Sequence, residues 1–154
     1  MFLYLVQHAE AKRKDEDLER DLTEKGRRDV EKLAKFVAQL DLPVGQIWHS
    51  GKTRALSTGK ILANSLNPPQ GFKEAKGLAP LDDPEGWADR FSAMDENIML
   101  VGHLPHLARL AALLLTGDQE KNVIDFKMGG MVCLRRGPEA RWTVAWMIIP
   151  EIIF

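Results

Sequence analysis

Disulfide bonds, membrane spans and a dominant charge are all missing from this sequence of 154 residues. Its one cysteine, Cys133, lies in an apolar run, where a buried small side chain is far more common than a nucleophile. No apolar stretch approaches the ~18 residues of a membrane-spanning helix, and residues 2–6 lack the flanks of a signal peptide. We therefore expect a cytoplasmic protein with no membrane partner.

An excess of one charge is missing too, because 21 Lys and Arg face 22 Asp and Glu, with a formal net charge of -1 at pH 7. Such a balance gives no field that attracts nucleic acid, so no nucleic-acid partner is expected. The glycine-rich phosphate loop and the glycines of a nucleophile elbow around Ser50 are also absent. No Asp or Glu stands at ligand spacing beside His103, so neither a metal nor another cofactor is expected.

Three apolar segments that each end in polar residues are the informative feature. Residues 2–6 lead into Gln7-His8, residues 47–49 lead into a segment ending at Arg54, and residues 98–101 lead into Gly102-His103. In open α/β sheets, ligands bind at the carboxyl ends of the strands. The pattern therefore predicts that two histidines and an arginine meet at one edge of a sheet, which points to phosphoryl chemistry.

The remaining patterns predict a single three-layer α/β/α domain over residues 1–154, with a mixed, mostly parallel sheet. Helices are expected over 23–40, 53–66, 87–94 and 105–115, strands over 2–6, 44–49, 72–75 and 98–101, and a hairpin over 131–136 and 142–148. The apolar faces of the first two helices are expected to include Leu40 and Leu56. The apolar tail from Ile148 to Phe154 is expected to dock on the domain or to contact another subunit; the sequence leaves the oligomeric state open.

Cations near the expected edge suit a phosphoryl group. Arg54 begins a helix, and its guanidinium can bind two phosphoryl oxygens at once, whereas Lys52 would act as a point charge. Arg20 stands just before the first helix with the same capacity. His103 precedes a helix start, where free backbone N–H groups favour an anion.

Three motifs extend this pattern: Arg20-Asp21-Leu22-Thr23-Glu24-Lys25-Gly26, Ser50-Gly51-Lys52-Thr53-Arg54-Ala55 and Val101-Gly102-His103-Leu104-Pro105. Together with the strand that ends at His8, they resemble the histidine phosphatase superfamily, and within it the SixA-like phosphohistidine phosphatases. The resemblance covers essentially the whole chain and implies a phosphoglycerate mutase-like fold. It also implies that His8 is a nucleophile that becomes phosphorylated.

The resemblance further implies which residues surround the phosphoryl group. Arg54 and His103 would act with His8 in catalysis, and the remaining phosphate contacts would come from Gln7, Arg20 and Ser50. The physical chemistry agrees, because a neutral imidazole is a good nucleophile and surrounding cations stabilise the transferring group.

One departure from the family pattern stands beside the nucleophile. The family has Arg-His-Gly where this chain has Gln7-His8-Ala9, so one fixed cation is missing and Ala9 is expected to keep a negative φ. Nearby cations could replace the charge; the candidates are Lys12, Arg13 and Lys52. Alternatively, the substrate carries less charge, or catalysis is weakened and the site serves binding.

A general acid for the leaving group is less well defined. The segment 77–85 offers Asp82 and Asp83, although Asp residues near proline are common in turns. Three functions therefore stay open. The first is removal of phosphate from a phosphohistidine on a protein, the second is hydrolysis of small phosphomonoesters, and the third is binding of phosphate or of a phosphoprotein.

Overall fold

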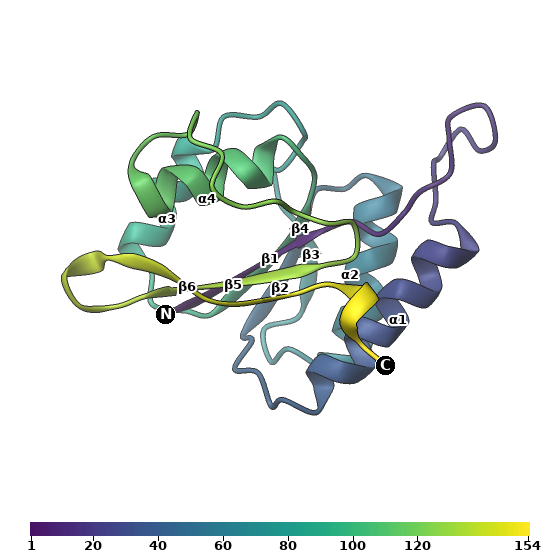
Figure 1. Ribbon diagram of the computed structural model, residues 1–154, viewed down its shortest axis with the longest axis horizontal. Helices are drawn as coiled ribbons and strands as arrows, with labels where there is room; N and C mark the ends of the chain where they lie inside the picture. Colours follow the sequence, from purple (N-terminus) through teal and green to yellow (C-terminus); the bar gives the residue numbers. More distant parts are fainter.

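A sheet of six strands forms the centre of the molecule in the computed structural model, which describes residues 1–154 (Figure 1). The strands lie in the order β3-β2-β4-β1-β5-β6. Their bounds are β1 Phe2–Gln7, β2 Gln46–His49, β3 Phe72–Glu74, β4 Ile98–Gly102, β5 Met131–Arg136 and β6 Trp142–Ile148. The first strand of the chain therefore lies in the middle of the sheet, between β4 and β5.

The sheet is mixed, as predicted. β1 runs parallel to β4, β4 parallel to β2, and β2 parallel to β3, whereas β5 is antiparallel to both β1 and β6. The predicted hairpin is confirmed, because β5 and β6 have the expected bounds. The strand expected over 44–49 begins only at Gln46, since the N–H groups of Val44 and Gly45 donate to loop carbonyls instead.

Helices cover both faces of the sheet (Figure 1). α1 (Glu24–Ala38) and α2 (Thr53–Leu66) lie on one face, and α3 (Glu85–Ala93) and α4 (His106–Thr116) lie on the other. Side chains alternate along β1, so Tyr4 and Val6 pack with α1 and α2 while Leu3 and Leu5 pack with α3 and α4. This confirms the predicted three-layer α/β/α fold. Two short 3₁₀ helices, η1 (Pro138–Ala140) and η2 (Pro150–Ile152), belong to the C-terminal part.

Two expected core residues lie at the surface instead. Leu40 is exposed because α1 ends at Ala38, before the next turn could bring that side chain to the sheet. Leu56 is exposed because α2 packs through small residues, among them Gly59, where an added Cβ would lie 2.7 Å from the ring of Phe72. The hydrophobic pattern alone does not reveal this close approach.

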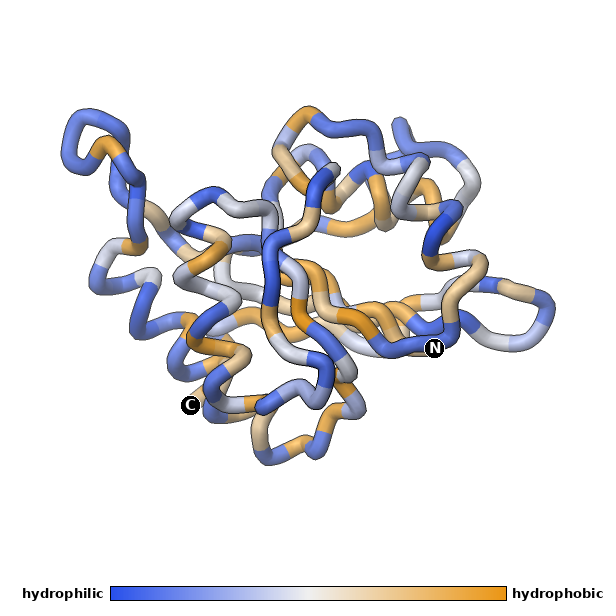
Figure 2. The backbone as a smooth tube through the Cα atoms, turned by 180° about the vertical axis from the view of Figure 1, so that it is seen from behind, coloured by the Kyte–Doolittle hydropathy of each residue, from blue (hydrophilic) through white to orange (hydrophobic).

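The apolar tail docks in part on the domain. Ile153 is buried in the core beneath α1, whereas Phe154 is fully exposed. Figure 2 shows that the apolar segments gather in the strands, whereas the segment between β1 and α1 projects from the body and is largely hydrophilic. None of the helices has both the length and the apolar character needed to cross a membrane.

The start of α1 packs directly on the backbone that follows β1. Thr23 caps the helix by accepting a hydrogen bond from Gly26 N, and its own N–H donates to the carbonyl of Glu10 at 3.0 Å. A Cβ added at Gly26 would lie 2.1 Å from that same carbonyl oxygen. Only glycine therefore allows the helix to approach this closely.

This contact predicts opposite effects for the same substitution in the first turns of two helices. Gly26→Ala should lower the free energy of unfolding by roughly 2 kcal/mol or more, because the backbone of Glu10 cannot move away cheaply. Gly86→Ala in α3, where an added Cβ meets nothing within 4 Å, should raise it by about 0.5–1 kcal/mol. Urea unfolding of both variants measures the difference, and equal effects would contradict the close approach.

Candidate active site

The carboxyl ends of the parallel strands bring two histidines side by side. Gln7 pairs with Gly102 in the register of β1 and β4, so His8 and His103 follow at matching positions. Their ring centroids are 5.1 Å apart, with planes inclined by 49°. Ser50 follows β2, and its Oγ lies 2.6 Å from His103 Nε2. The structure thus brings these three predicted residues together.

The ring of His8 has a defined orientation. Its Nδ1 lies 2.8 Å from the carbonyl oxygen of Ala9, and because a carbonyl only accepts, Nδ1 carries the proton. The lone pair of the neutral ring is therefore on Nε2, the atom available for attack. Ala9 itself keeps a negative φ, as predicted.

Both histidines are held neutral at physiological pH. Burial lowers the pKa of His8 and outweighs the hydrogen bond to Ala9, and the charges of Arg54 and Arg20 lower it further. Burial also lowers the pKa of His103 to about 3, with His8, Arg54 and Lys52 contributing repulsion. No carboxylate is among the groups that shift either ring.

Three cationic side chains without a carboxylate partner lie near the histidine pair. Neither Arg20, Arg54 nor Lys52 forms a salt bridge, and Arg54 Nε is buried without a hydrogen-bond partner. Burial and the nearby Arg20 lower the pKa of the Arg54 guanidinium. These three residues line an open hollow of about 440 Å³ together with Lys14, Leu18, Glu19, Gly51 and Thr53. A concave surface with unpaired guanidinium groups suits an oxyanion.

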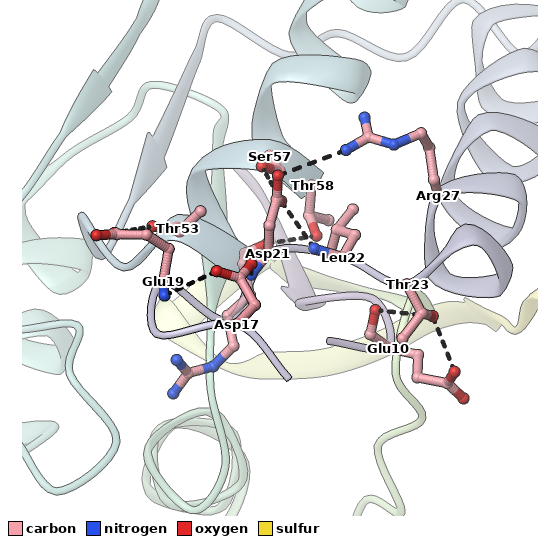
Figure 3. A network of polar contacts seen from close by, with 11 residues as sticks. Glu10, Asp17, Glu19, Asp21, Leu22, Thr23, Arg27, Thr53, Ser57 and Thr58 are labelled. Atoms are coloured by element: carbon pink, nitrogen blue, oxygen red, sulfur yellow. Dashed lines mark hydrogen bonds and ion pairs between the residues drawn. The ribbon is translucent and has the colours of Figure 1, made fainter. Parts of the chain in front are cut away.

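The loop that carries Arg20 is folded by the carboxylate of Asp17, whose contacts with Glu19 and Asp21 are drawn in Figure 3. The Asp17 carboxylate accepts hydrogen bonds from the backbone N–H groups of Glu19 and Asp21, at 3.1 and 3.0 Å. The turn between them leaves Arg20 with a φ of 51°, a conformation that costs energy for a residue with a side chain. Arg20 Nε then donates to the carbonyl of Lys12, which leaves the terminal nitrogens free for a ligand.

Asp21 ties this loop to both neighbouring helices (Figure 3). Its carboxylate accepts hydrogen bonds from Ser57 Oγ of α2 at 2.6 Å and from Leu22 N at 2.7 Å, and it faces Arg27 of α1 at 3.7 Å. Although burial raises the pKa of Asp21, these hydrogen bonds and nearby cations lower it overall. The carboxylate therefore stays ionised and keeps the loop of Arg20 in place.

The three cations that could replace the missing arginine lie in different surroundings. Arg13 is highly exposed and pairs with Asp15 and Glu16, so it is engaged elsewhere. Lys12 contributes its carbonyl to Arg20, and its charge acts on Asp21 rather than on the histidines. Lys52 alone is among the charges that lower the pKa of His103.

Gln7 is the last residue of β1, and its side chain is buried at the rim of the sheet. Its Oε1 has no hydrogen-bond partner. The backbone around it is tightly held, because Gly129 N donates to the carbonyls of Gln7 and His8 at 3.0 and 3.3 Å. The side chain is thus neutral and incompletely paired beside His8.

Asp82 and Asp83 are engaged in local turns. Asp82 Oδ2 accepts from Ala79 N at 2.9 Å, and Asp83 Oδ1 accepts from Glu85 N at 3.0 Å at the start of α3. The histidine whose pKa they influence is His106, not the His8–His103 pair. The structure therefore does not group them with the other predicted residues.

Two residues near the site are not predicted by the sequence patterns. Thr58 is fully buried on α2 and contacts both Ala9 and Arg54. A polar residue on the packed face of a helix, one turn after Arg54, is the signal that could have revealed it. Glu19, the one carboxylate that lines the hollow, accepts from Thr53 Oγ1 at 3.3 Å and stands in a charged loop that gives no such signal.

Comparisons with known proteins identify the family to which this chain belongs. The family model of the histidine phosphatase superfamily (branch 1) matches residues 3–79, and the chain belongs to this superfamily. A comparison with curated protein sequences gave no match. No group of three or more His, Cys, Asp or Glu residues is arranged to hold a metal ion.

Solved structures show the same fold. The protein histidine phosphatase SixA, complexed with tungstate, has a TM-score of 0.86 at 20% identity over 98% of each chain. A SixA-type protein from Agrobacterium tumefaciens has a TM-score of 0.78 at 21% identity over 97% of each chain. A mycobacterial glucosyl-3-phosphoglycerate phosphatase has a TM-score of 0.72 at 15% identity, over 94% of this chain and 97% of its own. At these identities, the likeness establishes the phosphoglycerate mutase-like fold alone.

Because of its histidines, we expect the free energy of unfolding of the protein to fall in mild acid. All four, His8, His49, His103 and His106, have a pKa lowered chiefly by burial. The unfolded chain takes up protons below about pH 6.5, whereas the folded chain resists them, so the free energy of unfolding falls as the pH drops. Each histidine contributes up to about 1.4 kcal/mol per pH unit until its own folded pKa is reached.

Urea unfolding between about pH 7.5 and pH 5 measures this slope. His106→Gln removes one buried imidazole whose pKa is influenced by Asp82 and Asp83 and by no cation. The free energy of unfolding of this variant should therefore depend on pH with a slope that is shallower by about one proton. A free energy of unfolding that stays constant over this range would contradict the assigned neutral state.

Proposed function

We propose that the protein is a phosphatase that works through a covalent phosphohistidine at His8 and removes phosphate from a phosphohistidine on another protein. The observation that carries this proposal is the neutral His8 ring with a free Nε2, next to guanidinium groups that have no carboxylate partner. No metal is required in this scheme, because the arginines supply the positive charge at the transferring group.

The reaction has two steps. In the first, His8 Nε2 attacks phosphorus, the new N–P bond forms, and the bond between phosphorus and the leaving group breaks. In the second, water attacks phosphorus, the bond to His8 breaks, and inorganic phosphate leaves. Throughout, the proton stays on His8 Nδ1, which donates a hydrogen bond to the carbonyl of Ala9, while Arg54, Arg20 and His103 bind the phosphoryl oxygens.

The choice of a phosphohistidine substrate rests on the leaving group and on access. An imidazole leaves phosphorus more readily than an alkoxide, and no carboxylate acts on the histidine pair as an evident proton donor. The hollow lined by Arg20, Lys52 and Arg54 is open, which suits a side chain on a protein surface. The SixA structure, which has the same fold, is a complex with tungstate, an oxyanion of phosphate-like shape, and this supports an oxyanion as a ligand of the present protein.

A first experiment offers two substrates, a histidine-phosphorylated protein and a generic phosphomonoester. We expect turnover of the phosphoprotein and little of the ester, together with an acid-labile phosphate trapped on the enzyme. His8→Ala should lower kcat/KM by roughly 10³-fold or more and abolish the trapped phosphate, while circular dichroism confirms that the variant is folded.

Other outcomes identify the alternatives. Hydrolysis of both substrates would favour a small-molecule phosphomonoesterase, with Asp82 or Asp83 as the acid to be tested by substitution with asparagine. Binding of the phosphoprotein without turnover would favour a binding module in which Gln7 has removed the activity. Turnover that survives in His8→Ala would refute the proposed mechanism.

The charge of Lys52 can be tested separately. We propose that Lys52 replaces part of the charge that Gln7 does not supply. Lys52→Met should lower kcat/KM about tenfold, since a charged hydrogen bond is worth ~1.5–3 kcal/mol. Gln7→Arg should raise kcat/KM about tenfold and make the Lys52→Met substitution milder.

Matched controls isolate the charge. Lys60→Met removes an exposed lysine from α2, the helix that follows Lys52, away from the hollow, and should have no effect on kcat/KM. Gln7→Met keeps the size of the side chain without the amide. A folded Gln7→Arg variant with no gain, or an equal loss from Lys52→Met in both backgrounds, would rule out compensation.

A further inference from the structure

A continuous chain of hydrogen bonds joins the ring of His8 to the helix that carries Arg54. His8 Nδ1 donates to the Ala9 carbonyl at 2.8 Å, and Ala9 N donates to Thr58 Oγ1 at 3.0 Å. Thr58 Oγ1 in turn donates to the carbonyl of Arg54 at 2.8 Å. The directions are fixed, because carbonyls only accept and the threonine hydroxyl has a single proton.

The position of Ala9 explains why this hydroxyl is needed. The backbone N–H of His8 still has a strand partner, the carbonyl of Gly102 at 3.0 Å, but β1 has ended by the next residue. Ala9 is fully buried, so its N–H has no access to water and needs a partner within the protein. Thr58, itself fully buried, supplies the acceptor.

We infer that Thr58 is a positioning residue whose hydroxyl holds the backbone of Ala9 against α2 and thereby fixes the plane and tautomer of the His8 ring relative to Arg54. The inference rests on the proposed function for the role of His8 as nucleophile. Without the hydroxyl, the buried N–H of Ala9 loses its partner and the segment shifts to find another. The Ala9 carbonyl then no longer keeps the proton on Nδ1, and part of the His8 population carries it on Nε2, where it blocks attack.

Thr58→Val tests this inference, because valine has nearly the same shape and no hydroxyl. We expect kcat to fall about tenfold or more while KM changes less than about threefold, since the residues that bind the phosphoryl group are unchanged. Thr58→Ser restores the hydroxyl and should restore most of kcat. Thr116→Val in α4 removes a similar hydrogen bond, from Thr116 Oγ1 to the Ala112 carbonyl at 2.8 Å, and should leave kcat unchanged.

Nitrogen-15 NMR of the histidine rings, recorded without substrate, reads the tautomer of His8 directly. The unmodified protein should carry the His8 proton on Nδ1, Thr58→Val should give a mixture of both tautomers, and Thr58→Ser should return to Nδ1. Because this measurement needs no turnover, a failure of the inference remains distinct from a failure of the proposed phosphatase activity.

Two results would overturn the inference. One is a folded Thr58→Val protein with the His8 proton still on Nδ1 and an unchanged kcat. The other is Thr58→Ser being as impaired as Thr58→Val, which would mean that shape matters and the hydroxyl does not. If Thr58→Val yields no folded protein, Thr58→Ala takes its place with the same measurements and the same two deciding results.

Discussion

The parallel pairing of β1 with β4 is the constraint on which the site depends. It sets Gln7 opposite Gly102, and the chain continues from these two positions into His8 and His103. A shift of this register would turn the two rings to opposite faces and separate them. The hydrogen bond from His8 N to the carbonyl of Gly102 extends the pairing beyond the end of β1 and holds His8 at the rim of the sheet.

The surrounding cations depend on a different kind of support. Arg54 is placed by a regular helix, whereas Arg20 is placed by a loop that carboxylates fold from within and anchor to two helices. The carboxylates of Asp17 and Asp21 thus position Arg20 without neutralising its charge, because their oxygens accept hydrogen bonds from backbone N–H groups and a serine hydroxyl. The result is a site whose charge is free for a ligand.

Much of this arrangement could be predicted from the sequence, because apolar segments that end in polar residues fix both the strands and their functional ends. The hairpin, the layers and the joint position of His8 and His103 follow from such patterns. Leu40 and Leu56 were wrongly assigned to the core, since the end of α1 and the close packing of Gly59 depend on tertiary contacts.

The hydrogen bonds that support the site could not be predicted from the sequence for a similar reason. Thr58 acts on Ala9 across 49 positions of the chain, and Asp21 acts on Ser57 across 36. Such hydrogen bonds leave no periodic signal, since each needs one polar atom at one place. The surroundings of Asp82 and Asp83 were equally hidden, because a turn that consumes a carboxylate looks in sequence like a loop that offers one.

The place of β1 in the sheet also governs when the protein can assemble. This strand precedes both of its neighbours in the sequence, because β4 and β5 begin only at Ile98 and Met131. A growing chain therefore carries an apolar, unpaired strand until most of the sequence has emerged from the ribosome. Contacts between such distant segments close slowly, so His8 reaches its neighbours late in folding. The approach of His8 to His103 thus depends on segments that lie far apart in the sequence.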